Sequence, residues 1–253
     1  NLEDDCAVLP LGSETLILTH DMMVEGIHFL PAQDMADVAW KLVAVNLSDL
    51  AAKGAEPLGV MLGYSLGEND ARFAEGLGEV CEAYRVPLLG GDTVRGAGPR
   101  SFGLTALGRA THTPVPDRRG ACAGDAIYVT GTLGAAMLGF EAIRDGSGAD
   151  STAYRRPRPL LAEGRALAPV VSAMMDVSDG LLLDCWRMAR ASHATFQLES
   201  ADFPVADPAR LNECVRWGDD YELLFTARAD IALPVAATRI GTVLEQDVAA
   251  LWV

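Results

Sequence analysis

The sequence has few basic residues and no long apolar run, and each shortage excludes a class of protein. Only 20 Lys and Arg residues stand against 35 Asp and Glu residues in 253, which gives a formal net charge of −15. Such a chain repels nucleic acid and anionic membranes unless it carries a local basic patch. The arginine pair at 118–119 and the segment 154–159 are too short to form one. No apolar run reaches the roughly 18 residues of a membrane span. We therefore expect neither a nucleic-acid partner nor a membrane partner.

Cysteines are also few, and several common motifs are missing. The five cysteines are scattered and no CxxC occurs, which argues against a zinc site or a disulfide framework. No segment resembles an export signal, so we expect a reducing, cytoplasmic setting. There is no GxxxxGK[ST] loop and no protein-kinase motif set, so two large groups of phosphoryl-transfer enzymes are excluded.

What the sequence does contain is an alternation of apolar strands and helices. The apolar spacing of 35–55 predicts a helix, with Asp34 as its N-cap and Gly54 as its C-cap. The segment 111–125, rich in Pro, Gly and charge, is the best candidate for a linker. We therefore predict two α/β-type domains, residues 1–114 and 115–253. The expected strands are 15–21, 58–66, 86–93, 101–110, 126–131, 172–177, 194–200, 221–227 and 237–245, and the expected helices are 35–55, 70–85, 131–144, 160–170 and 179–193.

Aspartates recur where apolar strands end. Strands end at Asp21, Asp92 and Asp176, and other acids stand at 4–5, 49 and 219–220. One at a time, such residues are usually caps or turn residues. Carboxylates that converge repel one another and lose hydration, so together they need a cation. Few Lys or Arg residues are near in sequence, and oxygen ligands without Cys or His pairs favour Mg²⁺.

The stretch SAMMDVSDGLLLD, residues 172–184, places two carboxylates three residues apart at a strand-to-helix turn. Asp176 and Asp179 can both point into one site there, and a helix N-terminus would attract phosphate. An N-cap followed by a first-turn acid explains this stretch equally well. In the turn at 90–92, two glycines would let a phosphate approach the backbone while Asp92 holds a metal, although an ordinary turn also fits.

Seven motifs stand in an order that resembles the thiamine-monophosphate kinase family. They are DDCAVL, THDMMVEGIHF, WKLVAVNLSDLAAKGAEP, LLGGDTVR, GDAIYVTGTLG, MMDVSDGL and GDDYELLF, and they run over essentially the whole chain. That family belongs to the ATP-binding superfamily of aminoimidazole ribonucleotide synthetase and selenophosphate synthetase. The resemblance implies an aminoimidazole ribonucleotide synthetase-like fold of two α/β (α+β) domains. The N-terminal sheets would pair into a barrel in a homodimer, with ATP in the cleft at that pairing.

The resemblance also implies a reaction and its residues. The γ-phosphoryl group of ATP would pass to thiamine monophosphate and give thiamine diphosphate, with several Mg²⁺ ions. The implied metal ligands are Asp5, Thr19, His20, Asp21, Asp49, Asp92, Asp176 and Asp179. The implied ATP contacts are Gly91, Asp92, Arg119 and Ser178, and the implied substrate contacts are His28 and Asp219.

The chemistry of that reaction needs no nucleophilic side chain. The acceptor is a phosphate monoester whose second pKa is about 6, so it is largely dianionic near neutral pH. We therefore expect neither a covalent nucleophile nor a general base, but charge neutralisation and in-line positioning. Two alternatives stay open: another ATP-dependent enzyme of the superfamily, such as aminoimidazole ribonucleotide synthetase, and a non-catalytic nucleotide-binding subunit. Mg²⁺-dependent ATP turnover would separate the last of these from an enzyme.

Overall fold

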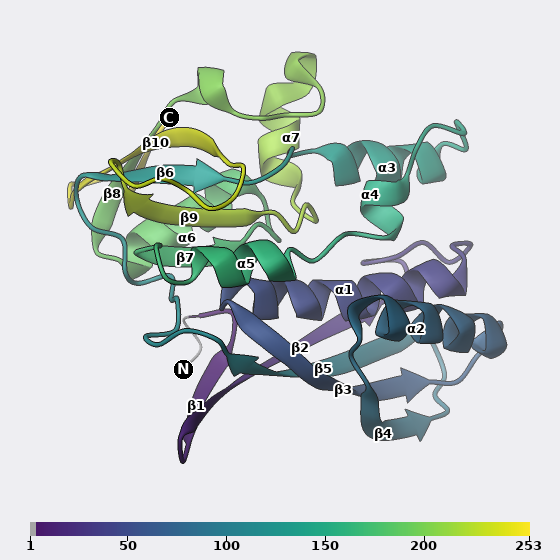
Figure 1. The fold of residues 1–253 in the computed structure, drawn as a ribbon. Helices are drawn as coiled ribbons and strands as arrows, with labels where there is room; N and C mark the ends of the chain where they lie inside the picture. Colours follow the sequence, from purple (N-terminus) through teal and green to yellow (C-terminus); the bar gives the residue numbers. More distant parts are fainter. Residues whose placement is uncertain (1–3) are drawn as a thin grey trace.

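One long helix, α1 (Met35–Ala52), lies between the two halves of the protein (Figure 1). In this computed structural model, which describes residues 4–253, all of its 18 residues except Trp40 and Asp49 are buried. A helix that is apolar on all sides is typical of an element covered on all sides. α1 packs on the first sheet with one face and on α5 (Leu161–Leu167) and β7 (Ala173–Asp176) with another.

The first sheet has the strand order β1-β2-β5-β3-β4. All neighbours are antiparallel except β3 and β4, which run parallel. Helix α2 (Asp70–Tyr84) connects these two strands and lies beside α1 on the same face of the sheet (Figure 1). The strands are β1 (Ala7–Leu11), β2 (Glu14–Val24), β3 (Ala55–Ser65), β4 (Leu88–Val94) and β5 (Ser101–Ala110).

The second sheet has the strand order β11-β8-β10-β6-β9-β7 and is antiparallel except for the β11–β8 pair. Its other strands are β6 (Asp125–Val129), β8 (Ala194–Leu198), β9 (Leu223–Arg228), β10 (Thr238–Glu245) and β11 (Leu251–Trp252). The remaining helices are α3 (Ala135–Arg144), α4 (Thr152–Arg155), α6 (Leu181–Ala191) and α7 (Leu211–Trp217), with two 3₁₀ turns, Ser200–Asp202 and Pro208–Arg210.

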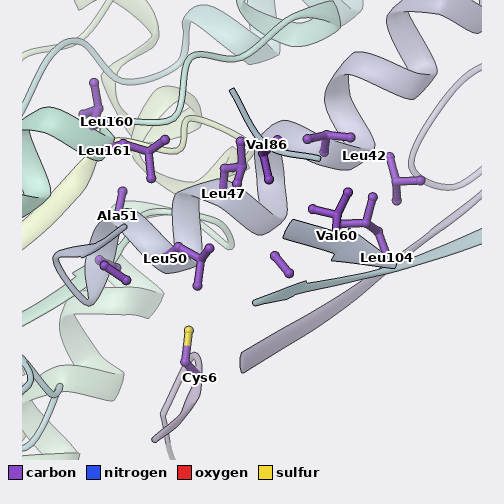
Figure 2. Close-up of a cluster of buried hydrophobic side chains, with 14 of the residues drawn as sticks. Cys6, Leu42, Leu47, Leu50, Ala51, Val60, Val86, Leu104, Leu160 and Leu161 are labelled. Atoms are coloured by element: carbon purple, nitrogen blue, oxygen red, sulfur yellow. The ribbon is translucent and has the colours of Figure 1, made fainter. Parts of the chain in front are cut away.

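The larger hydrophobic core joins the two halves through α1. Leu42, Leu47 and Leu50 of α1 pack with strand residues of the first sheet and with Leu160 and Leu161 at the start of α5 (Figure 2). The same cluster includes Met174 of β7 and Phe225 of β9. A second cluster lies between the other face of the second sheet and α6. Side chains of both sheets are therefore buried in the one core that surrounds α1.

The elements predicted from the sequence are present, with ends that differ by a few residues. The Asp34 side chain accepts a hydrogen bond from the Ala36 N–H (2.9 Å), so the predicted N-cap is confirmed. The C-cap is Lys53 rather than Gly54, which follows it with a φ of +58°. Four elements, β1, α4, α7 and β11, are not predicted. Within residues 4–253, no helix combines the length and the hydrophobicity that a membrane span needs.

Candidate active site

A cavity of about 360 Å³ opens where the two halves meet, and both halves line it. Residues before β1, on β2 and on α1 form one side, and the end of β7, the loop before α6 and the residues before β9 form the other. Five carboxylates from distant parts of the chain face this space: Asp5, Asp21, Asp49, Asp176 and Asp179. The fold thus gathers acids that stand up to 174 positions apart, which is the arrangement expected of a cation site.

Three of these carboxylates form the centre of the cluster. One oxygen from each of Asp5, Asp49 and Asp176 lies within 4.8 Å of the other two. The Thr19 hydroxyl donates to Asp49 Oδ2, and the Ser48 hydroxyl donates to Asp176 Oδ2 at 2.6 Å. These hydroxyls fix the orientation of the two acids from behind, so the other oxygen of each is available to the cavity.

Without a bound cation, burial makes the ionised form of these carboxylates electrostatically unfavourable. Burial, followed by repulsion from Asp176 and other acids, raises the pKa of Asp49 well above its ordinary value. Burial and the charge of Asp5 do the same to the pKa of Asp176. Carboxylates in this state are stabilised in their ionised form by a bound cation. The donor set is entirely oxygen, so the residues fit Mg²⁺.

Basic side chains neutralise part of the cluster. This corrects the expectation, drawn from the few Lys and Arg residues near the acids in sequence, that a cation alone would balance their charge. Burial acts to raise the pKa of Asp5, but the ammonium of Lys53 and the guanidinium of Arg118 outweigh it and leave that pKa lowered. Lys53 lies 3.0 Å from Asp5 Oδ2, and Arg118 also pairs with Asp5. Because Arg118 is 113 positions from Asp5 in sequence, the pairing was not visible in the spacing of residues.

The loop before α6 is held by a second layer of polar contacts. The Asp179 N–H donates to Asp184 Oδ2 at 3.1 Å, and Arg187 pairs with both Asp179 and Asp184. Asp184 is buried, and burial raises its pKa to about 6. The Ser178 carbonyl accepts from the Asp219 N–H at 2.8 Å. Asp179 therefore presents its carboxylate from a rigid turn.

On the other side of the cavity, a buried ammonium faces an aspartate. Lys41 Nζ lies 2.5 Å from Asp219 Oδ2 and 3.8 Å from the centre of the Tyr154 ring. The Tyr221 hydroxyl donates to Asp219 Oδ1 at 2.7 Å. Burial lowers the pKa of Lys41, although Asp219 opposes that shift. The ring of His28 lines the same cavity, and its Nδ1 accepts from the Val24 N–H at 3.1 Å.

Two family models together match most of the chain. The model described as AIR synthase related protein, N-terminal domain, matches residues 3–110, and the model for the C-terminal domain matches residues 123–251. The thiamine-monophosphate kinase of Escherichia coli (strain K12) is 37% identical over 247 residues, covering 88% of this chain and 74% of that protein. The chain belongs to the thiamine-monophosphate kinase family. It is therefore an enzyme, a phosphotransferase.

Other relatives agree with this assignment. The thiamine-monophosphate kinase of Caulobacter vibrioides is 39% identical over 246 residues, covering 88% of this chain and 70% of that protein. The structure of AaThiL complexed with AMPPCP and TMP is 26% identical, covers 99% of this chain and 87% of that chain, and has a TM-score of 0.91. The crystal structure of thiamine-monophosphate kinase from Stenotrophomonas maltophilia K279a is 32% identical, covers 98% of this chain and 90% of that chain, and has a TM-score of 0.85. The predicted two-domain α/β fold is confirmed.

The sites expected of a thiamine-monophosphate kinase come together only in part within this chain. Asp5, Asp21, His28, Asp49, Asp176, Ser178, Asp179 and Asp219 all line the one cavity. Thr19 lies directly behind it, against Asp49. The His20 ring points to the opposite face of β2, where Nδ1 lies 2.9 Å from Thr105 Oγ1. Among residues 4–253, no hydrogen bond or ion pair links the ring to the carboxylates, and a metal-binding role for His20 stays a prediction that its backbone carbonyl would fulfil more readily than its ring.

Three predicted residues lie elsewhere. Gly91 and Asp92 on β4 line a separate cavity of about 270 Å³ beside α2. Arg119 lines a third cavity and pairs with Asp117. In the family's reaction these residues would need either a second chain or an extended ligand to take part.

Sequence reasoning missed four residues that line the cavity, Lys41, Arg118, Arg187 and Tyr221. It also missed two that support its acids by hydrogen bonds, Ser48 and Asp184. The sequence held a signal for Lys41, because it is the one basic residue in the apolar run from 35 to 52. Arg118 was set aside as part of a pair too short for nucleic acid, although two arginines suffice to contact carboxylates or phosphates. No signal was available for Asp184 and Arg187, which look like ordinary polar residues of an amphipathic helix.

Proposed function

We propose that the protein transfers the γ-phosphoryl group of ATP directly to thiamine monophosphate, giving thiamine diphosphate. The observation that carries this proposal is the convergence of Asp5, Asp49 and Asp176 within 4.8 Å in a cavity that Asp21 and Asp179 also line. The structural relative with AMPPCP, an analogue of ATP, and TMP supports the choice of both substrates. Because the acceptor phosphate is itself an anionic nucleophile, we propose transfer without a phosphoenzyme.

The carboxylates would hold several Mg²⁺ ions. Asp5, Asp21, Asp49, Asp176 and Asp179 are the candidate side-chain ligands, with Thr19 and the backbone of His20 beside them. Mg²⁺ bound there would neutralise the phosphates of donor and acceptor. The oxygen ligands of the cavity support the binding of several Mg²⁺ ions, and the position of the acids between the two halves supports in-line transfer.

The chain's own residues bind and orient the acceptor. His28, Lys41 and Asp219 all line the cavity. The Asp219 carboxylate suits the cationic thiazolium ring of thiamine, and the Lys41 ammonium suits its phosphate. Ser178 and the arginines at 118 and 119 lie toward the second half of the protein, where we place the phosphates of ATP.

We further propose that the protein works as a homodimer. β1 and β4, the two edges of the first sheet, are exposed along their whole length. Their apolar side chains include Leu9, Leu11, Leu88 and Leu89, which are between 47% and 60% exposed. Pairing of these sheets in two copies would bury that surface. It would also let Gly91 and Asp92 of each chain reach the cavity of the other.

The remaining proposals concern the domain boundaries and the cellular compartment. Residues 1–114 and 115–253 are proposed as the two domains, because each range contains one complete sheet. A cytoplasmic setting is supported by the cysteines at 6, 81, 122, 185 and 214, all of which are free.

The decisive experiment follows labelled phosphate from γ-labelled ATP to thiamine monophosphate in the presence of Mg²⁺, with Asp179→Asn alongside. Label should appear in thiamine diphosphate with the unaltered protein and fall by about 100-fold or more with the variant, because a metal ligand and a charge are lost. An exposed acid outside the cavity gives the control, Asp145→Asn, which should leave transfer unchanged. ATP turnover without label in thiamine diphosphate would contradict the proposal.

A further inference from the structure

The segment 150–157, which contains α4, contacts two residues that line the cavity between the two halves. It lies between α3 and α1 (Figure 1). Asp37, a buried residue of α1, pairs with both Arg155 and Arg156 of this segment. The segment is therefore fixed to α1 directly after Tyr154, the residue that reaches the cavity.

The Tyr154 side chain is packed on one side and contacts the cavity on the other. It is 3% exposed, and the ring of Phe140 in α3 packs edge-on against it with the ring centres 5.4 Å apart. On the side of the cavity, Lys41 Nζ lies 3.8 Å from the centre of the Tyr154 ring. The Tyr154 hydroxyl donates to the His28 carbonyl at 3.1 Å. One buried side chain thus holds both Lys41 and the turn that carries His28.

The ring limits the directions in which the Lys41 ammonium can point. An ammonium has three N–H donors, and among residues 4–253 Asp219 is the one hydrogen-bond acceptor of Lys41. The face of the Tyr154 ring attracts the cation and covers a second direction. A donor is left for a ligand in the cavity that Lys41 lines, and an oxygen of a phosphate suits it.

The hydroxyl acts on a turn that has few other contacts. The His28 N–H donates to the Val24 carbonyl at 2.9 Å, and His28 Nδ1 accepts from the Val24 N–H. These bonds close the turn on itself. Ile27, the next residue in the turn, is 76% exposed, so packing holds it weakly. The bond from Tyr154 ties the turn to the second half of the protein.

We infer that Tyr154 is a positioning residue for the acceptor: its ring directs the Lys41 ammonium toward the acceptor phosphate, and its hydroxyl fixes the turn that carries His28. This inference rests on the proposed function, because it takes the acceptor to be a phosphate monoester that lies between these two residues. Tyr154 should therefore affect the binding of the acceptor and leave the binding of ATP unchanged.

The kinetic test compares Tyr154→Phe, which removes only the hydroxyl, with Tyr154→Leu, which also removes the ring. KM for thiamine monophosphate should rise about threefold in the first and about tenfold or more in the second. KM for ATP should stay within about twofold in both. In a protein that already carries Lys41→Met, Tyr154→Leu should raise KM for thiamine monophosphate by about threefold at most, because only the bond to His28 remains to be lost.

The matched control is Tyr128→Leu. Tyr128 is 9% exposed, stacks on Phe225 with the ring centres 5.3 Å apart, and lies outside the lining of the cavity. Its replacement also removes a buried, stacked ring, so stability should fall without a difference between the two KM values. If Tyr128→Leu raised KM for thiamine monophosphate as much as Tyr154→Leu does, Tyr154 would act only through the fold.

The chain has only two lysines, Lys41 and Lys53, which gives a readout that does not depend on transfer. Protein labelled with ¹³C at lysine Cε should give two NMR signals, and Lys41→Arg identifies one of them. Loss of the aromatic ring in Tyr154→Leu should shift the Lys41 signal, whereas Tyr154→Phe should leave it near its original position. The signal of Lys53, which pairs with Asp4 and Asp5, should not respond.

The outcomes separate this inference from the proposed function. If the Lys41 signal shifts in Tyr154→Leu while the unaltered protein transfers no phosphate to thiamine monophosphate, the positioning of Lys41 holds and the proposed acceptor is wrong. If transfer occurs and the Lys41 signal stays in place, or both KM values rise equally, the inference is overturned. If Tyr154→Leu does not fold, Tyr154→Phe decides, because an unchanged KM for thiamine monophosphate in that variant also overturns the inference.

Discussion

At the scale of single residues, the needs of folding and of cation binding oppose each other at Asp176. Its side chain is 2% exposed, and burial with neighbouring negative charge raises its pKa well above the ordinary value. Asn has nearly the same shape and can still accept from Ser48. In metal-free buffer, Asp176→Asn should therefore increase the free energy of unfolding by about 1 kcal/mol or more while transfer falls at least about 100-fold. Urea unfolding with a chelator and the labelled-ATP assay measure the two effects.

The matched control for Asp176→Asn is Asp230→Asn. Asp230 is exposed and pairs with Arg228 on the surface, so stability and transfer should both stay close to those of the unaltered protein. If Asp176→Asn destabilised the metal-free protein instead, the interpretation of the cluster as a strained cation site would be wrong.

The pair formed by Lys41 and Asp219 gives a second prediction. Lys41→Met keeps the length of the side chain but removes the ammonium, which leaves Asp219 with the Tyr221 hydroxyl alone. KM for thiamine monophosphate should rise about tenfold or more, because the acceptor phosphate loses a cation, whereas KM for ATP should stay within about twofold. Lys41→Arg, which keeps the charge, should recover part of the loss. Equal effects on both KM values would show that Lys41 acts only through the fold.

The site residues that could be predicted are those that the neighbouring sequence makes recognisable. Asp21 and Asp176 follow apolar runs, although only Asp176 ends its strand and β2 continues past Asp21 to Val24. Asp49 and Asp179 stand in distinctive motifs, and the structure brings all four into one cavity. Lys41 pairs with Asp219 across 178 positions. No periodicity or spacing reports such a contact, so the counter-charges of the cavity became visible only in three dimensions.

At the scale of elements, two glycines of α2 provide an internal comparison. A methyl group added at Gly76 would overlap the backbone of Ala36 in α1, whereas nothing lies within 4 Å of the same position at Gly78. Gly76→Ala should therefore cost about 1–3 kcal/mol because it forces the two helices apart. Gly78→Ala should stabilise the protein by up to about 1 kcal/mol, the difference in helix propensity. Denaturant unfolding of both variants checks the prediction, and similar values for the two would contradict it.

The start of α3 makes stability depend on pH. Asp220 Oδ1 accepts from the Gly134 N–H at 2.9 Å, and burial raises the pKa of Asp220 to about 7. Between about pH 4 and pH 7 the folded protein keeps a proton there that the unfolded chain has lost. The contribution of Asp220 to stability therefore falls as pH rises through that window, by about 2–4 kcal/mol, and is flat above it.

Asp220→Asn isolates this contribution, since the amide does not titrate. The difference in unfolding free energy between the unaltered protein and the variant should decrease from pH 5 to pH 8 in urea titrations. A difference that stayed constant, or that increased with pH, would contradict a raised pKa.

Elements with a clear apolar run or period could be predicted from the sequence even when short, as the four residues of β7 show, and the remaining elements could not. α1 has 18 residues and a side-chain cap, and its start was predicted correctly. β1 has five residues, all exposed, and α7 has seven. Such segments depend on neighbours distant in the chain for their conformation, so their own residues carry little signal.

At the scale of the whole molecule, the proposed dimer predicts that two inactive variants can complement each other. Asp92→Asn should inactivate the cavity of the partner subunit, and Asp176→Asn should inactivate its own. Heterodimers of the two would contain one cavity with neither change. If the subunits exchange freely, an equal mixture should recover about a quarter of the unaltered activity. Each variant mixed with unaltered protein at the same total concentration gives the reference, and recovery of no activity would contradict the proposed role of Asp92 across the dimer.

The central position of α1 also has a consequence for how the protein is made. The core that surrounds this helix includes Met174 and Phe225, which leave the ribosome long after residues 35–52. During synthesis, the face of α1 that later contacts α5 and β7 must stay uncovered while more than a hundred further residues are added. An emerging chain with so apolar a surface binds chaperones and aggregates readily. Slow translation between α1 and β9 should therefore lower the yield of folded enzyme, whereas a pause after β9 should have little effect.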